Sequence, residues 1–128
     1  MASFQKLKAW EHAKALAVQC TMAARDFPAH EQQAMADQLR RAATGAALNV
    51  AEGASRTSNA EYRRFLDQAR ASLKEVSAIL EIAREVGYID SGSYARLEAR
   101  CEEASKTVYG LLRFIDGKLK AGEPRREV

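Results

Sequence analysis

Apolar residues recur every three or four positions along most of the chain, which is the spacing of one face of an α-helix. No segment alternates apolar and polar residues in the way that a half-buried strand does. The periodic pattern falls into four runs, and Pro28, Gly53 and Gly87 lie at or near the breaks between them. The pattern therefore predicts an all-α protein with four helices.

The first predicted helix runs from about Phe4 to Asp26. Pro28 ends it, because proline disfavours helical geometry in the residue before it. Its main apolar stripe consists of Ala9, Ala13, Leu16, Cys20, Ala24 and Phe27, and a thinner second stripe consists of Phe4, Leu7, Val18 and Met22. A helix that is apolar on two sides usually contacts more than one neighbour.

The second predicted helix runs from about Glu31 to Gly53, with the stripe Met35, Leu39, Ala42, Ala43, Ala46 and Val50. The third should begin at Ser58, because Glu61 follows three residues later and completes a capping box. Gly87 is a natural C-terminal stop for it. Its stripe is Tyr62, Leu66, Ala69, Leu73, Val76, Leu80 and Ala83.

The fourth predicted helix begins near Asp90 or Ser91. Its stripe is Tyr94, Leu97, Cys101, Ala104, Val108, Leu111, Ile115 and Leu119. Four such helices joined by short turns predict an antiparallel, up-down-up-down four-helix bundle that forms a single domain over residues 1–120. Residues 121–128 lose the periodicity, and we expect them to fray.

The composition suits such a bundle and narrows its setting only slightly. Hydrophobic residues make up 47% of the 128 residues, charged residues 29%, and there are only two prolines. The net charge of +3 permits a nucleic-acid or acidic-protein partner without requiring one. Because no apolar run approaches the length of a membrane span and the N-terminus lacks a signal-peptide core, we expect a soluble, cytoplasmic protein.

Few residues of the chain have the pattern of a catalytic or metal site. Cys20 and Cys101 fall within helical patterns and are expected to be small buried thiols. Neither His12 nor His30 follows a glutamate by three residues, as the di-iron sites of bundles require. Phosphate-loop and hydrolase motifs are also missing from the sequence. We therefore predict no metal, no cofactor and no enzymatic activity.

One pair leaves an enzymatic alternative open. Four residues separate Arg25 from His30, which resembles the arginine-x(4–6)-histidine motif of HEPN-type ribonucleases, themselves helical bundles. The other interpretation is an arginine that complements the dipole at the end of one helix and a histidine in the loop that follows.

The segment "LNVAEGASR" (48–56) carries an unusual outer face. Leu48 points away from the core stripe of the second helix and shares its face with Thr44, Gly45 and Ala51. Small residues let another backbone approach closely, and exposed apolar patches usually mark contacts. We therefore predict that Thr44, Gly45, Leu48 and Ala51 form an oligomer interface; the alternative is a solvated face.

Polar residues of the same segment are interpreted as a structural clamp on the turn that follows. Gly53 can end the helix, Glu52 lies four residues before Arg56, and the amide of Asn49 can hold backbone groups of the turn. A direct ligand site at Asn49, Glu52 and Gly53 is the alternative.

Arginines are frequent around the second connection, and guanidinium groups suit phosphate. They make Arg40, Arg41, Arg56, Arg63, Arg64 and Arg70 the candidate nucleic-acid-binding residues. The alternative is a solvated face with local ion pairs, such as Asp37 with Arg41, Glu52 with Arg56 and Asp67 with Lys74. The aromatic residues that could stack on RNA bases are expected to lie mostly in the helix seams.

The stretch "DQLRRAATGAALNVAEGASRTSNAEYRRFLDQARASLKE" (37–75) resembles the signature of a four-helix-bundle family that was first found as proteins encoded by intervening sequences in bacterial 23S rRNA genes. The resemblance extends over nearly the whole chain. The residues that carry it are Phe4, Leu7, Trp10, Ala13, Leu16, Pro28, Glu31, Gln38, Arg40, Arg41, Ala42, Ala43, Asn49, Ala51, Glu52, Gly53, Arg56, Phe65, Leu66, Ala69, Ser72, Glu75, Gly87 and Tyr88.

The resemblance implies a homopentamer without enzymatic activity. A related branch comprises the accessory proteins of diversity-generating retroelements, basic barrel-like pentamers that bind nucleic acid and a reverse transcriptase. This chain departs from the family pattern at Gly45, Ala47, Leu48 and Ala71, and its charge is modest for that branch. These differences are compatible with a pentamer and count against the retroelement role. We expect an oligomeric accessory protein that binds nucleic acid, RNA in the first place and DNA in the second. A reverse transcriptase-like protein is the further partner that the related branch implies. The alternative is a protein-interaction or structural scaffold.

Overall fold

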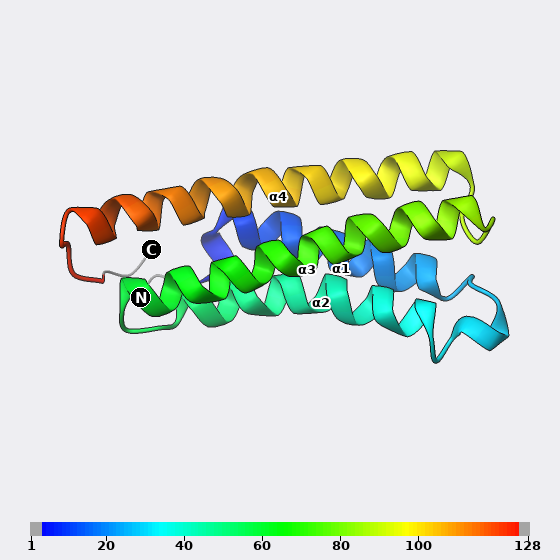
Figure 1. The fold of residues 1–128 in the computed structure, drawn as a ribbon, viewed down its shortest axis with the longest axis horizontal. Coiled ribbons are helices and arrows are strands. Elements are labelled where there is room, and N and C mark those ends of the chain that lie inside the picture. The colour runs from blue at the N-terminus through cyan, green and yellow to red at the C-terminus, as the bar shows by residue number, and fades with distance from the viewer. Residues whose placement is uncertain (1–3, 126–128) are drawn as a thin grey trace.

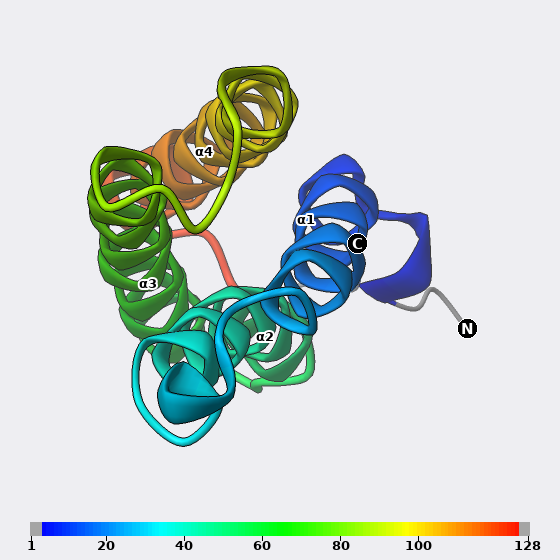
Figure 2. The ribbon, with the colours of Figure 1, turned by 90° about the vertical axis from the view of Figure 1, so that its right-hand side faces the viewer.

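The computed structural model describes residues 4–125 and folds them into four helices packed as a bundle (Figure 1). A short 3-10 helix, η1 (Phe4–Lys6), precedes α1 (Lys8–Ala24), and a second, η2 (Ala29–Glu31), precedes α2 (Met35–Ala54). After these come α3 (Asn59–Glu85) and α4 (Ser91–Lys120). Successive helices run in opposite directions, and Figure 2 shows them end-on, each beside the next in chain order and α4 returning toward α1. The predicted four-helix bundle is confirmed.

Three of the predicted helix ends are confirmed by their hydrogen bonds. The Ser58 side chain accepts from the backbone N–H of Glu61 at 3.1 Å, and the Asp90 carboxylate accepts from that of Ser93 at 2.7 Å. Gly87 ends α3 with φ of 85°, and the next backbone N–H, that of Tyr88, donates to the Ala83 carbonyl at 2.8 Å.

The start of α2 differs from the prediction. Glu31 belongs to η2, and α2 begins only at Met35. The Glu31 carboxylate accepts a hydrogen bond from the Met35 backbone N–H at 3.2 Å, so this residue helps to start the helix from outside it.

The predicted core stripes are confirmed in the first three helices, with one partial exception. The stripe residues of α3 are each at most 1% exposed, and all of those in α1 and the Phe27 that follows are buried. In α2 only Met35, at the helix start, is half-buried.

In α4 the predicted stripe is buried from Leu97 to Val108 and at Ile115, whereas Tyr94 is half-buried and the prediction is wrong at Leu111 and Leu119. After Val108 the buried stripe continues to Leu112, which is 3% exposed, and Leu111 is half-buried. Leu119 is 38% exposed because α1 does not extend to that end of the bundle.

The helices differ in length, and this leaves one end of the bundle thinner. α1 has 17 residues and α4 has 30. In Figure 1, α1 begins part-way along the bundle, so the end where α3 starts is built from α2, α3 and α4.

The segment after α4 turns back onto this thinner end. Asn59 donates its side-chain amide to the Glu123 carbonyl at 2.9 Å, and Arg125 donates to the Ala54 carbonyl at 2.6 Å. The Arg125 guanidinium also lies 4.6 Å from the ring centroid of Tyr62. Glu123 and Arg125 therefore lie against the α2–α3 turn. The fraying predicted for residues 121–128 stays a prediction, and residues 126–128 lie outside the described residues.

Three helical glycines occupy opposite kinds of environment. Gly53 is buried, and a Cβ added there would lie 3.0 Å from both Phe65 Cβ and Tyr62 Cδ1 of α3. The predicted end of α2 at Gly53 is off by one residue, because the helix continues through Gly53 to Ala54. A Cβ added at Gly110 or Gly117 of α4 would meet open space.

This contrast predicts opposite effects of the same substitution. Gly53→Ala should destabilise the fold by about 1–3 kcal/mol, because the added methyl group overpacks the contact between α2 and α3. Gly110→Ala and Gly117→Ala should each stabilise it by about 0.5–1 kcal/mol, because alanine favours the helix and meets nothing there. Urea unfolding measures the change in the free energy of unfolding for each of the three variants. A Gly53→Ala variant as stable as the unaltered protein would contradict the close contact.

Candidate nucleic-acid interface

The six candidate arginines do not form one cluster. Arg40 and Arg41 lie near the start of α2, whereas Arg56 follows its end. Fifteen helical residues span roughly 22 Å, so the two groups lie near opposite ends of the bundle. The predicted cluster around the second connection therefore reduces to Arg56, Arg63, Arg64 and Arg70.

The arginines of α2 are engaged by neighbouring polar groups. Asp37 lies 3.6 Å from Arg40 and 3.8 Å from Arg41, and Arg40 also donates to the Gln32 carbonyl at 2.6 Å. Arg56 pairs with Glu52 at 2.6 Å. The ion pairs expected of Arg41 and Arg56 are thus confirmed.

The arginines at the start of α3 are paired as well. Arg63 bonds to Asp116 of α4 at 2.7 Å and to Asp67 at 2.8 Å, and these hydrogen bonds raise the pKa of Arg63. Arg64 pairs with Glu61 at 3.1 Å, and the hydrogen bonds lower the pKa of that carboxyl. The predicted pair of Asp67 with Lys74 is wrong, because Asp67 has Arg63 one turn before it.

Arg70 differs from the other five candidates. It has no carboxylate partner among the described residues, and its guanidinium lies 4.8 Å from the ring centroid of Tyr109 in α4. Lys106, Arg113 and Lys120, in the second half of α4, likewise have no ion-pair partner within residues 4–125. These four cations of α3 and α4 are therefore open to an outside anion, and within residues 4–125 so are cations of other segments, such as Lys6, Lys8 and Lys14.

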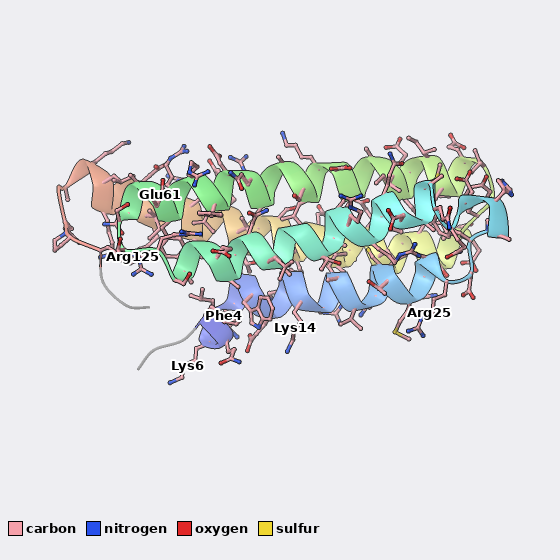
Figure 3. All side chains as sticks on the ribbon, turned by 90° about the horizontal axis from the view of Figure 1, so that it is seen from below. Phe4, Lys6, Lys14, Arg25, Glu61 and Arg125 are labelled. Carbon is pink, nitrogen blue, oxygen red and sulfur yellow. The ribbon has the colours of Figure 1, made fainter. Side chains whose placement is uncertain are left out.

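Dividing each helix at its middle reveals a strong separation of charge. The half that holds the α2–α3 turn and both described chain ends, which we name the basic half, has twelve cations and six carboxylates and a net charge of +6. The other half, the acidic half, has seven cations and ten carboxylates, a net charge of −3. The cations of the basic half are Lys6, Lys8, Lys14, Arg56, Arg63, Arg64, Arg70, Lys106, Arg113, Lys118, Lys120 and Arg125, and its carboxylates are Glu11, Glu52, Glu61, Asp67, Asp116 and Glu123. Lys6 and Lys14 project from the α1 side in Figure 3.

Exposed aromatic rings accompany these cations. Tyr109 is 44% and Phe114 is 54% exposed, which overturns for these two the expectation that aromatic residues lie in the seams. Arg113 lies 5.9 Å from the Tyr109 ring centroid, and Lys118 lies 4.8 Å from that of Phe114.

Sequence reasoning missed Lys106, Arg113, Lys118 and Lys120. The sequence did contain a signal for them, because the two halves of α4 differ in net charge. Residues 91–105 carry a net charge of −1, and residues 106–120 carry a net charge of +3. The antiparallel fold then places this second half beside the arginine-rich start of α3.

The predicted oligomer interface is only partly an exposed face. Leu48 is 56% exposed, and Thr44 is exposed on the same side of α2. Gly45 and Ala51 are half-buried, and a Cβ on Gly45 would lie 3.7 Å from Ser72 Oγ of α3. Leu48 therefore projects from a surface of small, partly buried residues. That this surface binds a second copy of the chain stays a prediction.

The residues of the predicted clamp have separate roles. Glu52 holds Arg56, whose guanidinium lies 4.5 Å from the Phe65 ring centroid, and Gly53 allows α3 to approach. Asn49 is half-buried, and its amide makes no hydrogen bond within the described part of the chain. The hydrogen bonds expected from Asn49 to the turn are thus not formed there.

Within residues 4–125, Arg25 and His30 make no hydrogen bond with each other. Arg25 follows the last residue of α1, and the His30 imidazole lies 3.4 Å from the Tyr88 hydroxyl. That hydroxyl donates to the Glu31 carboxylate at 2.7 Å. The three side chains join the α1–α2 connection to the α3–α4 connection.

Other chemical groups are scarce. Both cysteines are buried free thiols as predicted, and burial raises the pKa of Cys20 to about 12 and that of Cys101 to about 11. Residues 4–125 contain no group of three or more His, Cys, Asp or Glu side chains that could hold a metal ion. Among the same residues no helix is long and apolar enough to cross a membrane.

The sequence matches the family of 23S rRNA-intervening sequence proteins over residues 5–110. The chain belongs to this family. No curated protein matches it.

Among solved structures, the bundle is similar to a protein of unknown function from the S23 ribosomal protein family of Bacteroides thetaiotaomicron VPI-5482. The TM-score is 0.75 at 22% sequence identity, over 81% of this chain and 97% of that one. The similarity to this solved structure supports the four-helix bundle of the present family member.

The contact between Tyr88 and Glu31 predicts a change in acid stability. The hydrogen bond from Tyr88 lowers the pKa of Glu31 from its ordinary value of 4.5. The stabilisation is therefore complete above pH 4.5 and is lost as the pH falls through the lower pKa of the folded state.

Tyr88→Phe should remove most of the stabilisation that comes from this hydrogen bond. The variant should therefore be less stable than the unaltered protein above pH 4.5, and the two stabilities should become equal in acid. Thermal melting between pH 3 and pH 7 measures the difference. A difference in melting temperature between the two proteins that stays the same in acid would contradict the proposed role of the Glu31 carboxylate.

Proposed function

We propose that this protein of the 23S rRNA-intervening sequence family is a non-enzymatic, oligomeric accessory protein that associates with RNA. The observation that carries the proposal is the basic half, with its net charge of +6 and the unpaired cations Arg70, Lys106 and Arg113. Phosphate contacts supply most of the affinity of proteins for nucleic acid, and they need cations that are not already neutralised.

The position of these cations adds to the proposal. Arg70 of α3 and Arg113 of α4 both approach the Tyr109 ring, so these two cations come together around one exposed aromatic side chain. Cations grouped around an aromatic ring in this way can contact the phosphates next to a stacked base.

An oligomer would strengthen the effect, because several copies would concentrate the positive field. We propose a homopentamer that uses the outer face of α2 around Leu48 and Thr44. The support is a large apolar side chain, 56% exposed, on a face of small residues.

The second candidate function is a protein-interaction scaffold without nucleic acid. The ion pairs of Arg41, Arg56, Arg63 and Arg64 favour it, because paired arginines can simply keep the surface solvated. RNA affinity and its dependence on salt distinguish the two functions.

The RNA association is tested by removing unpaired charges. Lys106→Ala together with Arg113→Ala should weaken binding of an unstructured oligo-uridylate by about tenfold or more at low salt. It should also reduce the slope of log affinity against log salt by about 1.4, since each lost contact to a single strand accounts for about 0.7. Fluorescence anisotropy across a salt series measures both.

The matched control removes the same charge from the acidic half of the same helix. Arg96→Ala together with Arg100→Ala should change the affinity by less than about twofold, if binding depends on position and not on net charge. Equal losses in the two double variants, or no binding by the unaltered protein at low salt, would sink the proposal.

The assembly is tested separately. Leu48→Glu should lower the mass measured by light scattering from five chains toward one, because it places a charge in the apolar contact. Ile82→Glu, at a side chain of α3 that is 51% exposed, serves as the control and should leave the mass unchanged. An unchanged mass in Leu48→Glu would remove this face from the interface.

A further inference from the structure

We propose that the outer face of the second half of α4 binds the unpaired bases of single-stranded nucleic acid, with Tyr109 and Phe114 as stacking platforms. This inference rests on the proposed RNA association and specifies its ligand. Its elements are two exposed rings, the cations around them and the open backbone surface between them.

The two rings are available to an incoming base. About half of each side chain faces solvent, although Phe and Tyr are the side chains that a bundle gains most from burying. They are five residues apart, which is about 7.5 Å along the helix and about 140° around it. The rings therefore stand on the two flanks of one exposed face.

Cations hold and surround both platforms. Arg70 and Arg113 approach the Tyr109 ring, and Lys118 approaches the Phe114 ring at 4.8 Å. These contacts restrain the rings and place positive charge where a phosphate would follow each stacked base.

The surface between the rings is open. Lys106, Gly110, Arg113 and Gly117 share the outer face at helical spacing, and all four are exposed. Glycine in a helix interior is unfavourable, and a Cβ at Gly110 or Gly117 would clash with nothing in the bundle. The fold itself therefore does not require either glycine. Their absence of side chains leaves room for a strand to pass from one ring to the other, between Lys106 and Arg113.

The chemistry favours a single strand. Bases in a duplex are already stacked on one another, so they cannot use an aromatic side chain, whereas unpaired bases can. The net charge of +3 over residues 106–120 favours a polyanion over a second copy of the same positively charged face.

Two substitutions that keep apolar volume but remove the π-face test the inference. Tyr109→Leu and Phe114→Leu should each weaken binding of oligo-uridylate by about tenfold. The same variants should bind a duplex RNA within about twofold of the unaltered protein. Phe114→Trp should retain the affinity, and its fluorescence should be quenched when the single strand binds.

The outcomes separate this inference from the function on which it rests. Single-strand binding that depends on Lys106 and Arg113 but is unaltered in both leucine variants overturns the stacking platforms and leaves the RNA association standing. Equal losses for single strand and duplex also overturn it. If no RNA binds to the unaltered protein at low salt, both proposals fail. A lower assembly mass in Phe114→Leu, measured by light scattering, would assign the face to contact between copies.

Discussion

The structure depends on the close contact between α2 and α3. The buried side of α2 consists mostly of small residues, with Ala36, Ala42, Ala43, Ala46 and Ala47 supplemented by Gly53. Opposite them α3 supplies Tyr62 and a series of buried leucines. Small residues on one helix let the larger side chains of the other fill the space between the two axes. At Gly53 the fit is so close that a methyl group would enter only if Tyr62 and Phe65 of α3 moved away.

The antiparallel order of the helices gathers the positive charge of the chain at one end of the bundle. The chain carries a net charge of only +3, and its cations and carboxylates are scattered along it. Because α3 and α4 run in opposite directions, the basic start of one lies beside the basic end of the other. The connections at the opposite end, by contrast, bring together carboxylates such as Glu31, Glu85 and Asp90.

Periodicity predicted most of the fold because burial imposes a helical repeat on the sequence. The stripe of α3 could be predicted residue by residue, and so could the caps at Ser58 and Asp90. The stripe of α4 failed at Leu111, because 3.6 residues per turn permits a step of three or of four and only the neighbouring helix decides between them. The role of Gly53 was also missed, because a close approach between helices depends on the partner helix and leaves no mark in the local pattern.

The candidate site was less predictable for a related reason. The arginines near the second connection and local partners such as Glu52 for Arg56 were visible in the sequence. Asp116 of α4, the second partner of Arg63, lies far away along the chain and was not. The exposure of Phe114, at 54%, was likewise not visible in the sequence, because an apolar residue beside a core stripe is buried or exposed according to which helices pack against it. Local pairs could therefore be predicted from spacing, whereas pairs between helices needed the tertiary structure.

The separation of charge also gives the bundle an electric dipole along its length. Two copies placed side by side with their axes parallel bring like charges together, whereas antiparallel copies bring unlike charges together. A ring whose bundles lie along its rotation axis can contain only the parallel arrangement. In such a ring the contact between copies works against repulsion within the basic rim, and either salt or a bound polyanion relieves that repulsion. Ring closure and anion binding would then be thermodynamically linked, each favouring the other.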